Sequence, residues 1–295
     1  MPWLRWADQG AVRPLLSVTW RADSSTGCTR WRVSARSPDV AIAVTNLSKV
    51  FRRERGEETH VALQNLDMTV REGEFFCLLG PSGCGKTTLL NLIAGFEQPS
   101  GGKLEVFGKA VSGPAPERGV VFQTELALFS WLTVEENVEF GLKVRHVPAP
   151  ERREAVQRNL ELVGLTAYRR RFPHELSGGM KQRVQIARVL ANDPNVLLLD
   201  EPFAALDAQT RRNMQRELEA IWARTGKTAV FITHDIGESV TLGDRVGVMT
   251  RGPASRIKRI VEVDMPRPRG GAMTERFLEL YNLLSAEIEA ESTVG

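Results

Sequence analysis

The sequence predicts an α/β fold in which helices surround a mostly parallel, mixed sheet and a helical lobe is inserted into the sheet domain. Three short, almost continuously apolar segments are typical of strands buried on both faces, and they cover residues 73–79, 195–199 and 228–233. A glycine-rich loop, residues 80–88, follows the first segment and leads into helical spacing over residues 86–96. Strand, loop and helix in this order form the context of a phosphate-binding loop.

The other elements follow from the same patterns. Residues 41–47 are predicted to form a strand. Residues 131–192 are mainly helical in pattern, with residues 151–163 the clearest helix, and we interpret them as the inserted lobe. Apolar residues at helical spacing over residues 273–290 predict a terminal helix packed on the body. The expected division is an N-terminal extension at 1–40, a main domain at 41–265, and a C-terminal linker and helix at 266–295.

The composition is that of a globular protein. The chain has 295 residues, of which 42% are hydrophobic and 25% charged, enough for a large core. Cys28, Cys77 and Cys84 show no metal-ligand spacing, which argues against a disulfide framework and favours a reducing compartment. No apolar run reaches the roughly 18 residues of a membrane span, and the N-terminus lacks the apolar core of a signal peptide. We therefore expect a soluble chain, which can still sit on a membrane protein.

The net charge of +3 belongs to the first 40 residues, which hold six arginines and three aspartates, while the rest of the chain is balanced. A neutral body lacks the broad basic face that nucleic-acid phosphates require, so we expect no nucleic-acid partner. The same segment holds four tryptophans without a sustained period. We expect a poorly ordered tail or an over-long translation start, with a boundary near Pro38. The alternative is an arm of Trp and Arg side chains lying on lipid headgroups.

The glycine-rich loop fits the pattern in which small residues let successive backbone N–H groups turn toward a triphosphate. In that pattern Lys86 reaches the β- and γ-phosphates and Thr87 ligates Mg²⁺. Taken alone, the loop indicates only that a nucleotide binds, because kinases and GTPases share it. Its residues are Gly80, Pro81, Ser82, Gly83, Cys84, Gly85, Lys86, Thr87 and Thr88.

A second motif, at residues 176–183, places Ser177, Gly178 and Gly179 before a run with helical apolar spacing. A helix that begins in this way offers free N–H groups to an anion. Taken alone, the motif is also typical of a turn before a capped helix.

Polar side chains follow two of the predicted buried strands. Asp200 and Glu201 come directly after one strand, and His234 follows the next. In open parallel sheets, ligands bind beyond the carboxyl ends of the strands. We therefore expect these three side chains to converge near the phosphate loop.

The order and spacing of the motifs resemble the ABC ATPase family over roughly residues 41–265. Gln123 lies 37 residues after Lys86, Asp200 lies 23 after Ser177, and His234 lies 33 after Glu201. The resemblance implies a P-loop NTPase (RecA-like) core of the ABC ATPase type, with ATP as substrate and Mg²⁺ as its metal.

The resemblance also implies a role for each residue that matches the family's motifs. Phe51 stands where the family stacks adenine, although it is also a simple aromatic at a strand end. Thr87, Asp200 and Gln123 correspond to Mg²⁺ contacts. Glu201 corresponds to the general base for the attacking water. The remaining correspondences are Gln123 near the lytic water, His234 on the γ-phosphate and Asp207, which reports across the dimer or simply caps a helix.

The family's Ser177 loop closes over the ATP of a partner subunit, so the resemblance implies a head-to-tail dimer, here expected to be a homodimer, with two ATPs between the chains. Residues 128–138, 233–240 and 265–269 are similar to importer ATPases of the nitrate, sulfonate and taurine type. Ser130 departs from the usual proline of that group, and the proline-arginine run at 265–269 is otherwise a plain linker.

That subfamily implies a peripheral protein on the cytoplasmic face of the membrane, bound to permease subunits and served by a periplasmic or surface solute-binding protein. We expect Phe129 and Trp131 to form a surface pair beside acidic residues, which suits a groove for a short helix of the permease. The alternative is that the pair packs the lobe on the sheet. The alternatives are an importer of another solute and a non-transport ABC ATPase that remodels DNA or ribosomes. A small-molecule phosphotransferase has no use for the second motif.

Overall fold

The computed structural model describes residues 39–52, 59–123, 128–269 and 273–292. The chain divides into residues 1–39 and residues 40–295, and the architecture below is that of the second unit. The expectations for the N-terminal extension and for Cys28 lie outside the described residues.

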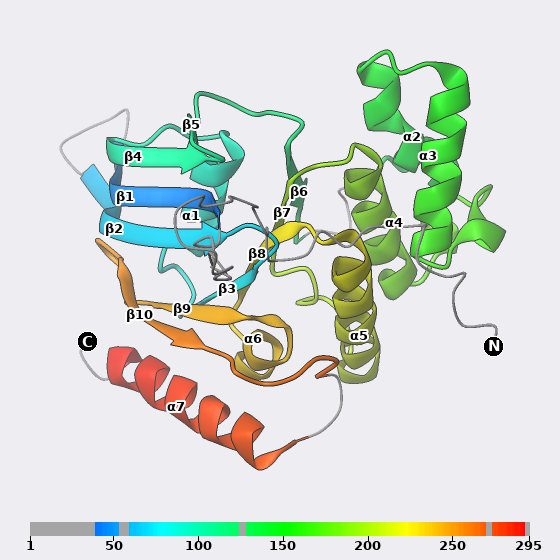
Figure 1. Ribbon diagram of the computed structural model, residues 1–295. Coiled ribbons are helices and arrows are strands. Elements are labelled where there is room, and N and C mark those ends of the chain that lie inside the picture. The colour runs from blue at the N-terminus through cyan, green and yellow to red at the C-terminus, as the bar shows by residue number, and fades with distance from the viewer. Residues whose placement is uncertain (1–38, 53–58, 124–127, 270–272, 293–295) are drawn as a thin grey trace, which may run out of the picture. The chain divides into compact units, whose positions relative to one another are not determined.

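A six-stranded sheet forms the centre of this unit, with the strand order β10-β9-β3-β8-β7-β6 (Figure 1). Five of its strands are parallel, and only the edge strand β10 runs antiparallel to its neighbour β9. The central strands are buried along their whole length, as their continuous apolar sequences predict. The strands are β3 (Phe75–Leu79), β6 (Arg118–Val121), β7 (Val196–Asp200), β8 (Thr228–Thr233), β9 (Arg245–Met249) and β10 (Ile257–Glu262).

Alternate side chains of the sheet enter two separate hydrophobic clusters. On β3, Phe75, Cys77 and Leu79 belong to one cluster, whereas Phe76 and Leu78 belong to the other. Successive strand residues point to opposite faces, so a strand that is apolar at every position supplies both clusters. The first cluster includes side chains of α2 to α7, and the second includes those of α1 and the smaller sheet.

The smaller sheet is antiparallel, with the order β2-β1-β4-β5. Helix α1 (Lys86–Ala94) contacts strands of both sheets. It ends at Gly95, whose left-handed backbone stops the helix two residues before the predicted end. The strands are β1 (Val40–Arg52), β2 (Thr59–Arg71), β4 (Gly101–Val106) and β5 (Lys109–Ala110).

The predicted helical lobe lies between β6 and β7 in the chain, at the upper right of Figure 1. Thr133 caps its first helix with a capping box, in which the Thr133 Oγ1 accepts from the Glu136 N–H and the Glu136 carboxylate accepts from the Thr133 N–H. The lobe comprises α2 (Val134–Val144), α3 (Ala149–Leu162), the short 3₁₀ turns η2 (Thr166–Tyr168) and η3 (Pro173–Glu175), and α4 (Gly178–Ala191).

The C-terminal part returns to the sheet with α5 (Ala208–Thr225), α6 (Ile236–Leu242) and α7 (Glu275–Ser292). Phe277, Leu280 and Leu284 of α7 are buried in the first cluster, which confirms the predicted terminal helix. Among the described residues, three ion pairs also join α7 to β10: Lys258 lies 3.2 Å from Glu287 and 3.1 Å from Glu291, and Arg259 lies 2.7 Å from Glu287.

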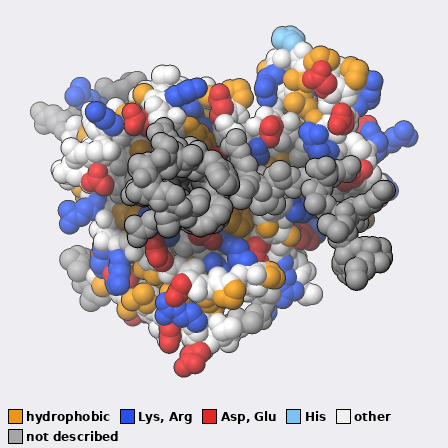
Figure 2. Space-filling model, in the orientation of Figure 1, with side chains coloured by type: hydrophobic (Ala, Val, Ile, Leu, Met, Phe, Trp, Pro, Cys, Tyr) orange, Lys and Arg blue, Asp and Glu red, His pale blue; other side chains and the backbone are white. Residues whose placement is uncertain are grey.

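The surface carries charges of both signs, and basic and acidic side chains are interspersed over the face shown in Figure 2. Within the described residues, no helix combines the length and the apolar character that crossing a membrane requires.

Candidate active site

The phosphate loop joins β3 to α1 through two glycines in the left-handed region, Gly83 at φ 77° and Gly85 at φ 87°. A Cβ on Gly85 would also lie 2.8 Å from Leu63 Cδ2 and 3.3 Å from the Ala62 carbonyl oxygen. Gly85 is the N-cap of α1 and supplies no side-chain hydrogen bond. The first N–H groups of α1 therefore lack a side-chain cap and suit an anionic ligand.

Lys86 lies across this loop and is only 5% exposed. Its Nζ donates to the Gly80 carbonyl oxygen at 2.8 Å and to the Pro81 carbonyl oxygen at 3.0 Å. Neighbouring Cys84 is fully buried, and burial raises the pKa of its thiol. A buried, protonated thiol agrees with the expectation that Cys84 fills space rather than acting as a nucleophile.

Thr87 and Asp200 meet at the carboxyl end of β7. The Thr87 hydroxyl donates to Asp200 Oδ1 at 3.3 Å, and Asp200 is 8% exposed. Burial raises the pKa of Asp200, while the Thr87 hydrogen bond opposes this shift. A hydroxyl and a carboxylate beside a phosphate loop fit Mg²⁺, which takes oxygen ligands and commonly uses only one or two protein groups together with substrate phosphates.

Three segments converge on the Glu201 carboxylate, and of these contacts the sequence predicts the approach of His234. Gln123 follows β6, Glu201 follows β7 and His234 follows β8, and β7 pairs with both other strands. Gln123 Nε2 donates to Glu201 Oε2 at 3.4 Å, and His234 Nδ1 lies 3.0 Å from the same oxygen. Glu201 has a left-handed backbone at φ 41°, a conformation that a glutamate rarely adopts.

The second motif forms the start of α4, as predicted. Ser177 is the N-cap, and its Oγ accepts a hydrogen bond from the Met180 N–H at 3.4 Å. A Cβ on Gly179 would lie 3.0 Å from Thr210 Cγ2 of α5, so this glycine allows the two helices to approach. Among the described residues, no hydrogen bond or ion pair connects Ser177, Gly178 or Gly179 to residues 80–88 of the same chain.

Two other predicted residues have clear structural contacts. Asp207 caps α5, because its Oδ1 accepts from the N–H groups of Gln209 and Thr210, both at 3.0 Å. The capping interpretation is thus confirmed, and the Thr210 hydrogen bonds lower the pKa of Asp207. Phe51 lies near the end of β1 with Lys49 Nζ 4.8 Å from its ring centroid. Its role in stacking adenine stays a prediction.

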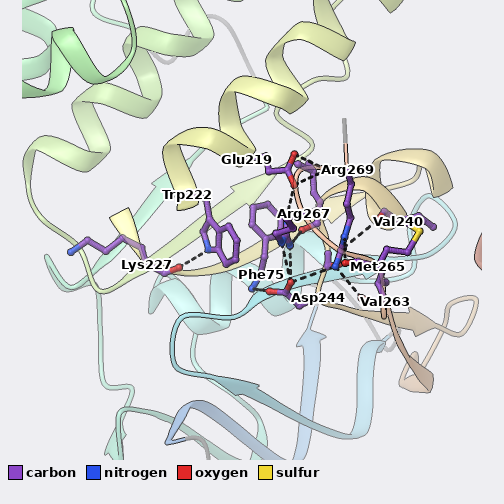
Figure 3. Close-up of polar contacts among 12 residues, drawn as sticks. Phe75, Glu219, Trp222, Lys227, Val240, Asp244, Val263, Met265, Arg267 and Arg269 are labelled. Atoms are coloured by element: carbon purple, nitrogen blue, oxygen red, sulfur yellow. Dashed lines mark hydrogen bonds and ion pairs between the residues drawn. The ribbon is translucent and has the colours of Figure 1, made fainter. Parts of the chain in front are cut away.

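Sequence reasoning missed a cluster of charged residues at the C-terminal end of α6 (Figure 3). Arg267 and Arg269 belong to the segment that we expected to be a linker, yet Arg269 is only 8% exposed. Both arginines contact Glu219 of α5, which is 4% exposed. The plain-linker interpretation of residues 265–269 is therefore wrong. The close spacing of the two arginines was the available signal, but their acidic partner lies about 50 positions earlier in the chain.

Comparisons with known proteins agree with this geometry. The model of the ABC transporter family matches residues 63–204. An uncharacterized ABC transporter ATP-binding protein of Methanocaldococcus jannaschii is 49% identical over 253 residues, covering 84% of this chain and 93% of the relative. The nitrate import ATP-binding protein NrtD of Synechococcus elongatus is 46% identical, covering 76% of this chain and 81% of the relative.

The bicarbonate transport ATP-binding protein CmpC of Synechococcus elongatus is 49% identical over 77% of this chain, and this chain spans about a third of its length, 34%. Among solved structures, a dimeric ATP-binding cassette in a post-hydrolysis state with ADP and Pi has a TM-score of 0.65 and 32% identity. It covers 76% of this chain and 100% of the cassette. The chain therefore belongs to the ABC transporter ATP-binding protein family and is an ATPase of that type.

Proposed function

We propose that this chain is the ATP-hydrolysing subunit of a membrane importer for small anionic solutes. The observation that carries the catalytic part is the convergence of Gln123 and His234 on Glu201, beside the Thr87 and Asp200 pair. Glu201 would orient or deprotonate the attacking water, and His234 would hold Glu201 and contact the γ-phosphate. Thr87, Asp200 and Gln123 would hold Mg²⁺, which neutralises charge on the phosphates.

The grip on the triphosphate would come from the phosphate loop. Uncapped N–H groups at the start of α1 and the Lys86 ammonium suit the negative charge. Lys86 would exchange its bonds to loop carbonyls for bonds to phosphate oxygens, while Phe51 would stack on the base.

The start of α4 would complete the site of a second copy of this chain. Ser177, Gly178 and Gly179 form a helix N-terminus that makes no bond to their own phosphate loop among the described residues. A triphosphate bound to one chain would still need hydrogen-bond donors on the side that faces away from the phosphate loop. The N–H groups at the start of the partner's α4 would supply them. Asp207, next to α5, would face the same interface. ATP would thus hold two subunits together, and hydrolysis would release them.

The importer assignment rests on relatives and on one surface. The names of relatives include nitrate import and bicarbonate transport, and both solutes are small oxyanions. We infer a solute of the nitrate, sulfonate or taurine kind, delivered by a solute-binding protein to permease subunits, with this chain peripheral on the cytoplasmic face. The same subunit on an importer of another solute is the second candidate.

A cavity of about 530 Å³ supports a permease contact. It adjoins the β6 end that leads to Gln123, and Phe129 and Phe140 line it with centroids 4.4 Å apart. Trp131, 71% exposed, lies 5.4 Å from the Phe129 ring. The buried side chain of Asn137 holds this turn through both the N–H and the carbonyl oxygen of Phe129. Such exposure argues against Trp131 packing the lobe on the sheet.

We propose that a short permease helix with apolar and acidic side chains enters this cavity. The walls of the cavity include aromatic rings and guanidinium groups. The apolar side chains of the helix would pack on the rings, and its acidic side chains would pair with the guanidinium groups. Motion of the helix would reach Glu201 through β6 and Gln123.

Uptake and hydrolysis should be measured together in vesicles that contain the reconstituted complex, with nitrate, bicarbonate and taurine as solutes. Lys86→Ala should abolish both uptake and ATP hydrolysis. Trp131→Ala should lower uptake while the isolated subunit keeps its basal hydrolysis. Uptake that survives Lys86→Ala would contradict the importer role. A Trp131→Ala variant that loses basal hydrolysis and melting temperature together would instead assign Trp131 to the core.

A further inference from the structure

Helix α6 is the element that joins His234 to the rest of the C-terminal part. It begins at Ile236, two residues after His234, and Asp235 caps it by accepting from the Glu238 N–H at 3.0 Å. The Thr233 hydroxyl donates to Glu238 Oε2 at 2.6 Å in a buried contact. The residues on both sides of His234, Thr233 and Asp235, are therefore bonded to the first turn of α6. A displacement of α6 would move the His234 imidazole.

The opposite end of α6 is held by two arginines from the segment after β10 (Figure 3). Arg267 Nη2 donates to the Leu242 carbonyl oxygen at 2.5 Å. Arg269 Nη1 donates to the carbonyl oxygens of Val240, at 3.5 Å, and Gly243. The last carbonyls of a helix have no partner within the helix and carry partial negative charge, so a cation that donates to them is favourable.

The two arginines are themselves fixed by partners, of which Glu219 is buried and Asp244 and Trp222 are half-buried. Arg267 lies 2.7 Å from Asp244 Oδ1 and 3.1 Å from Glu219 Oε1, and its Cζ is 4.4 Å from the Trp222 ring centroid. Figure 3 shows Glu219 and Trp222 of α5 on one side of this pair and Asp244 on the other. We call these five residues the arginine clip: Glu219, Trp222, Asp244, Arg267 and Arg269.

Arg269 contacts three separate parts of the chain. Its side chain is 4% exposed, and besides the α6 carbonyls it donates to the carbonyl oxygens of Val263 at 2.9 Å and Met265 at 3.0 Å. Its own N–H donates to Glu219. One planar guanidinium thus joins the end of α6 to the segment that leads toward α7, a geometry that a single ammonium cannot reproduce.

We propose that Arg267 and Arg269 are positioning residues for ATP hydrolysis: by fixing the C-terminal end of α6 they keep His234 against Glu201. This inference rests on the catalytic role proposed for His234. Neither arginine touches the nucleotide site, since their partners lie at the far end of α6 and on α5, so loss of the clip should lower turnover and leave ATP affinity unchanged. Their effect must pass through His234.

A double-mutant cycle tests that path. Arg269→Lys keeps the charge and should lower kcat about 10-fold, the order expected when a reacting group is slightly misplaced, while the Kd for ATP stays within about twofold. In a His234→Ala background the same change should have no further effect on kcat, because residues that act as a unit are not additive. Arg276→Lys is the matched control, since Arg276 pairs with Asp264 and Glu279 on the exposed side of α7. It should leave kcat unchanged both in the wild-type and in the His234→Ala background.

Glu219→Gln provides a second route if Arg269→Lys yields no folded protein. It keeps the shape of the side chain, removes the charge that holds both arginines, and should repeat the pattern in the same cycle. A wild-type kcat for the folded clip variants would overturn the inference. An equal loss with and without His234 would overturn it too, since it would show a general structural effect. A His234→Ala variant that hydrolyses ATP normally would instead refute the proposed role of His234 itself.

Discussion

We assign anion binding to two helix N-termini in this protein, and they differ in how much of a site each would provide. The start of α1 has a glycine N-cap without a side-chain bond, a buried lysine, and an oxygen pair from Thr87 and Asp200 nearby. The start of α4 has a serine N-cap that already accepts from the Met180 N–H. Neither helix has an acidic residue in its first turn.

This difference teaches that the two motifs are unequal halves. In the proposed function the phosphate loop would hold a triphosphate and Mg²⁺ by itself, because both a cation and oxygen groups lie beside its N–H groups. The start of α4 offers only a few donors and a hydroxyl, which are useful where another chain has already bound the nucleotide. Substitutions that affect one half and spare the other can test this assignment.

The largest expected effect follows from a change of Glu201, which lies beside the phosphate loop. Glu201→Gln should keep ATP binding and lower turnover at least about 10²-fold, the low end for the loss of a positioned base. An ATP-bound dimer should then accumulate, visible by size-exclusion chromatography with ATP. Near-normal steady-state hydrolysis, or loss of nucleotide binding, would remove Glu201 from this role.

Lys86→Ala should act one step earlier, on binding. Removing the only buried ammonium described in the loop should weaken ATP affinity by about 10-fold or more, as the loss of a charge-assisted contact to phosphate would. Titration with a fluorescent ATP analogue measures this change, and Glu201→Gln is the control that keeps affinity. An unchanged Kd would place the triphosphate elsewhere.

Mixing variants should show whether the two halves belong to different chains. Lys86→Ala and Ser177→Arg should each fail to associate with ATP. A mixed dimer contains one intact composite site and one doubly broken site, so ATP-induced association should partly return in sedimentation experiments. If either variant alone dimerises normally with ATP, the shared-site assignment is wrong.

The smallest effect separates capping by Ser177 from ligand binding. Ser177→Ala should lower the free energy of unfolding by about 1 kcal/mol or less, whereas Ser177→Gly should change it by only a few tenths, because glycine is tolerated as an N-cap. Both variants lack the hydroxyl and should weaken ATP-dependent dimerisation similarly. Denaturant unfolding and sedimentation measure the two quantities. Dimerisation that follows stability, with Ser177→Gly unaffected, would reduce Ser177 to a cap.

The sequence predicted the bounds of a strand accurately where the residues of the strand itself determine them. The strand at 228–233 was predicted to the residue, and the strand at 195–199 was off by one, because strands buried on both faces are apolar at every position. Strand β1 was predicted to stop at Leu47 but continues to Arg52. Its later residues alternate in burial within an antiparallel sheet and pair with β2 across register shifts, which blur the pattern.

The candidate site was largely predictable for a related reason. Asp200, Glu201 and His234 lie at the ends of two strands that are buried on both faces, so topology alone brings them to one edge of the sheet. Gln123 follows β6, which is only partly buried and is not among the strands that the sequence predicts. The sequence predicts that Phe129 and Trp131 both lie at the surface, but only Trp131 is exposed, whereas Phe129 is half-buried. The two side chains have the same apolar character, so only their surroundings in the fold separate them.

The sequence by itself determined the chemistry of this protein: a phosphate loop, the carboxylates and the histidine at strand ends, and the second helix N-terminus. Short-range rules suffice for these, since backbone N–H groups and strand ends are set within a few residues. Only the tertiary structure decided that the Arg267 and Arg269 segment is packed rather than a linker, and that it grips the end of α6. Burial of a charge depends on partners far away in the chain, here Glu219 and Asp244, and no local pattern records whether such partners meet.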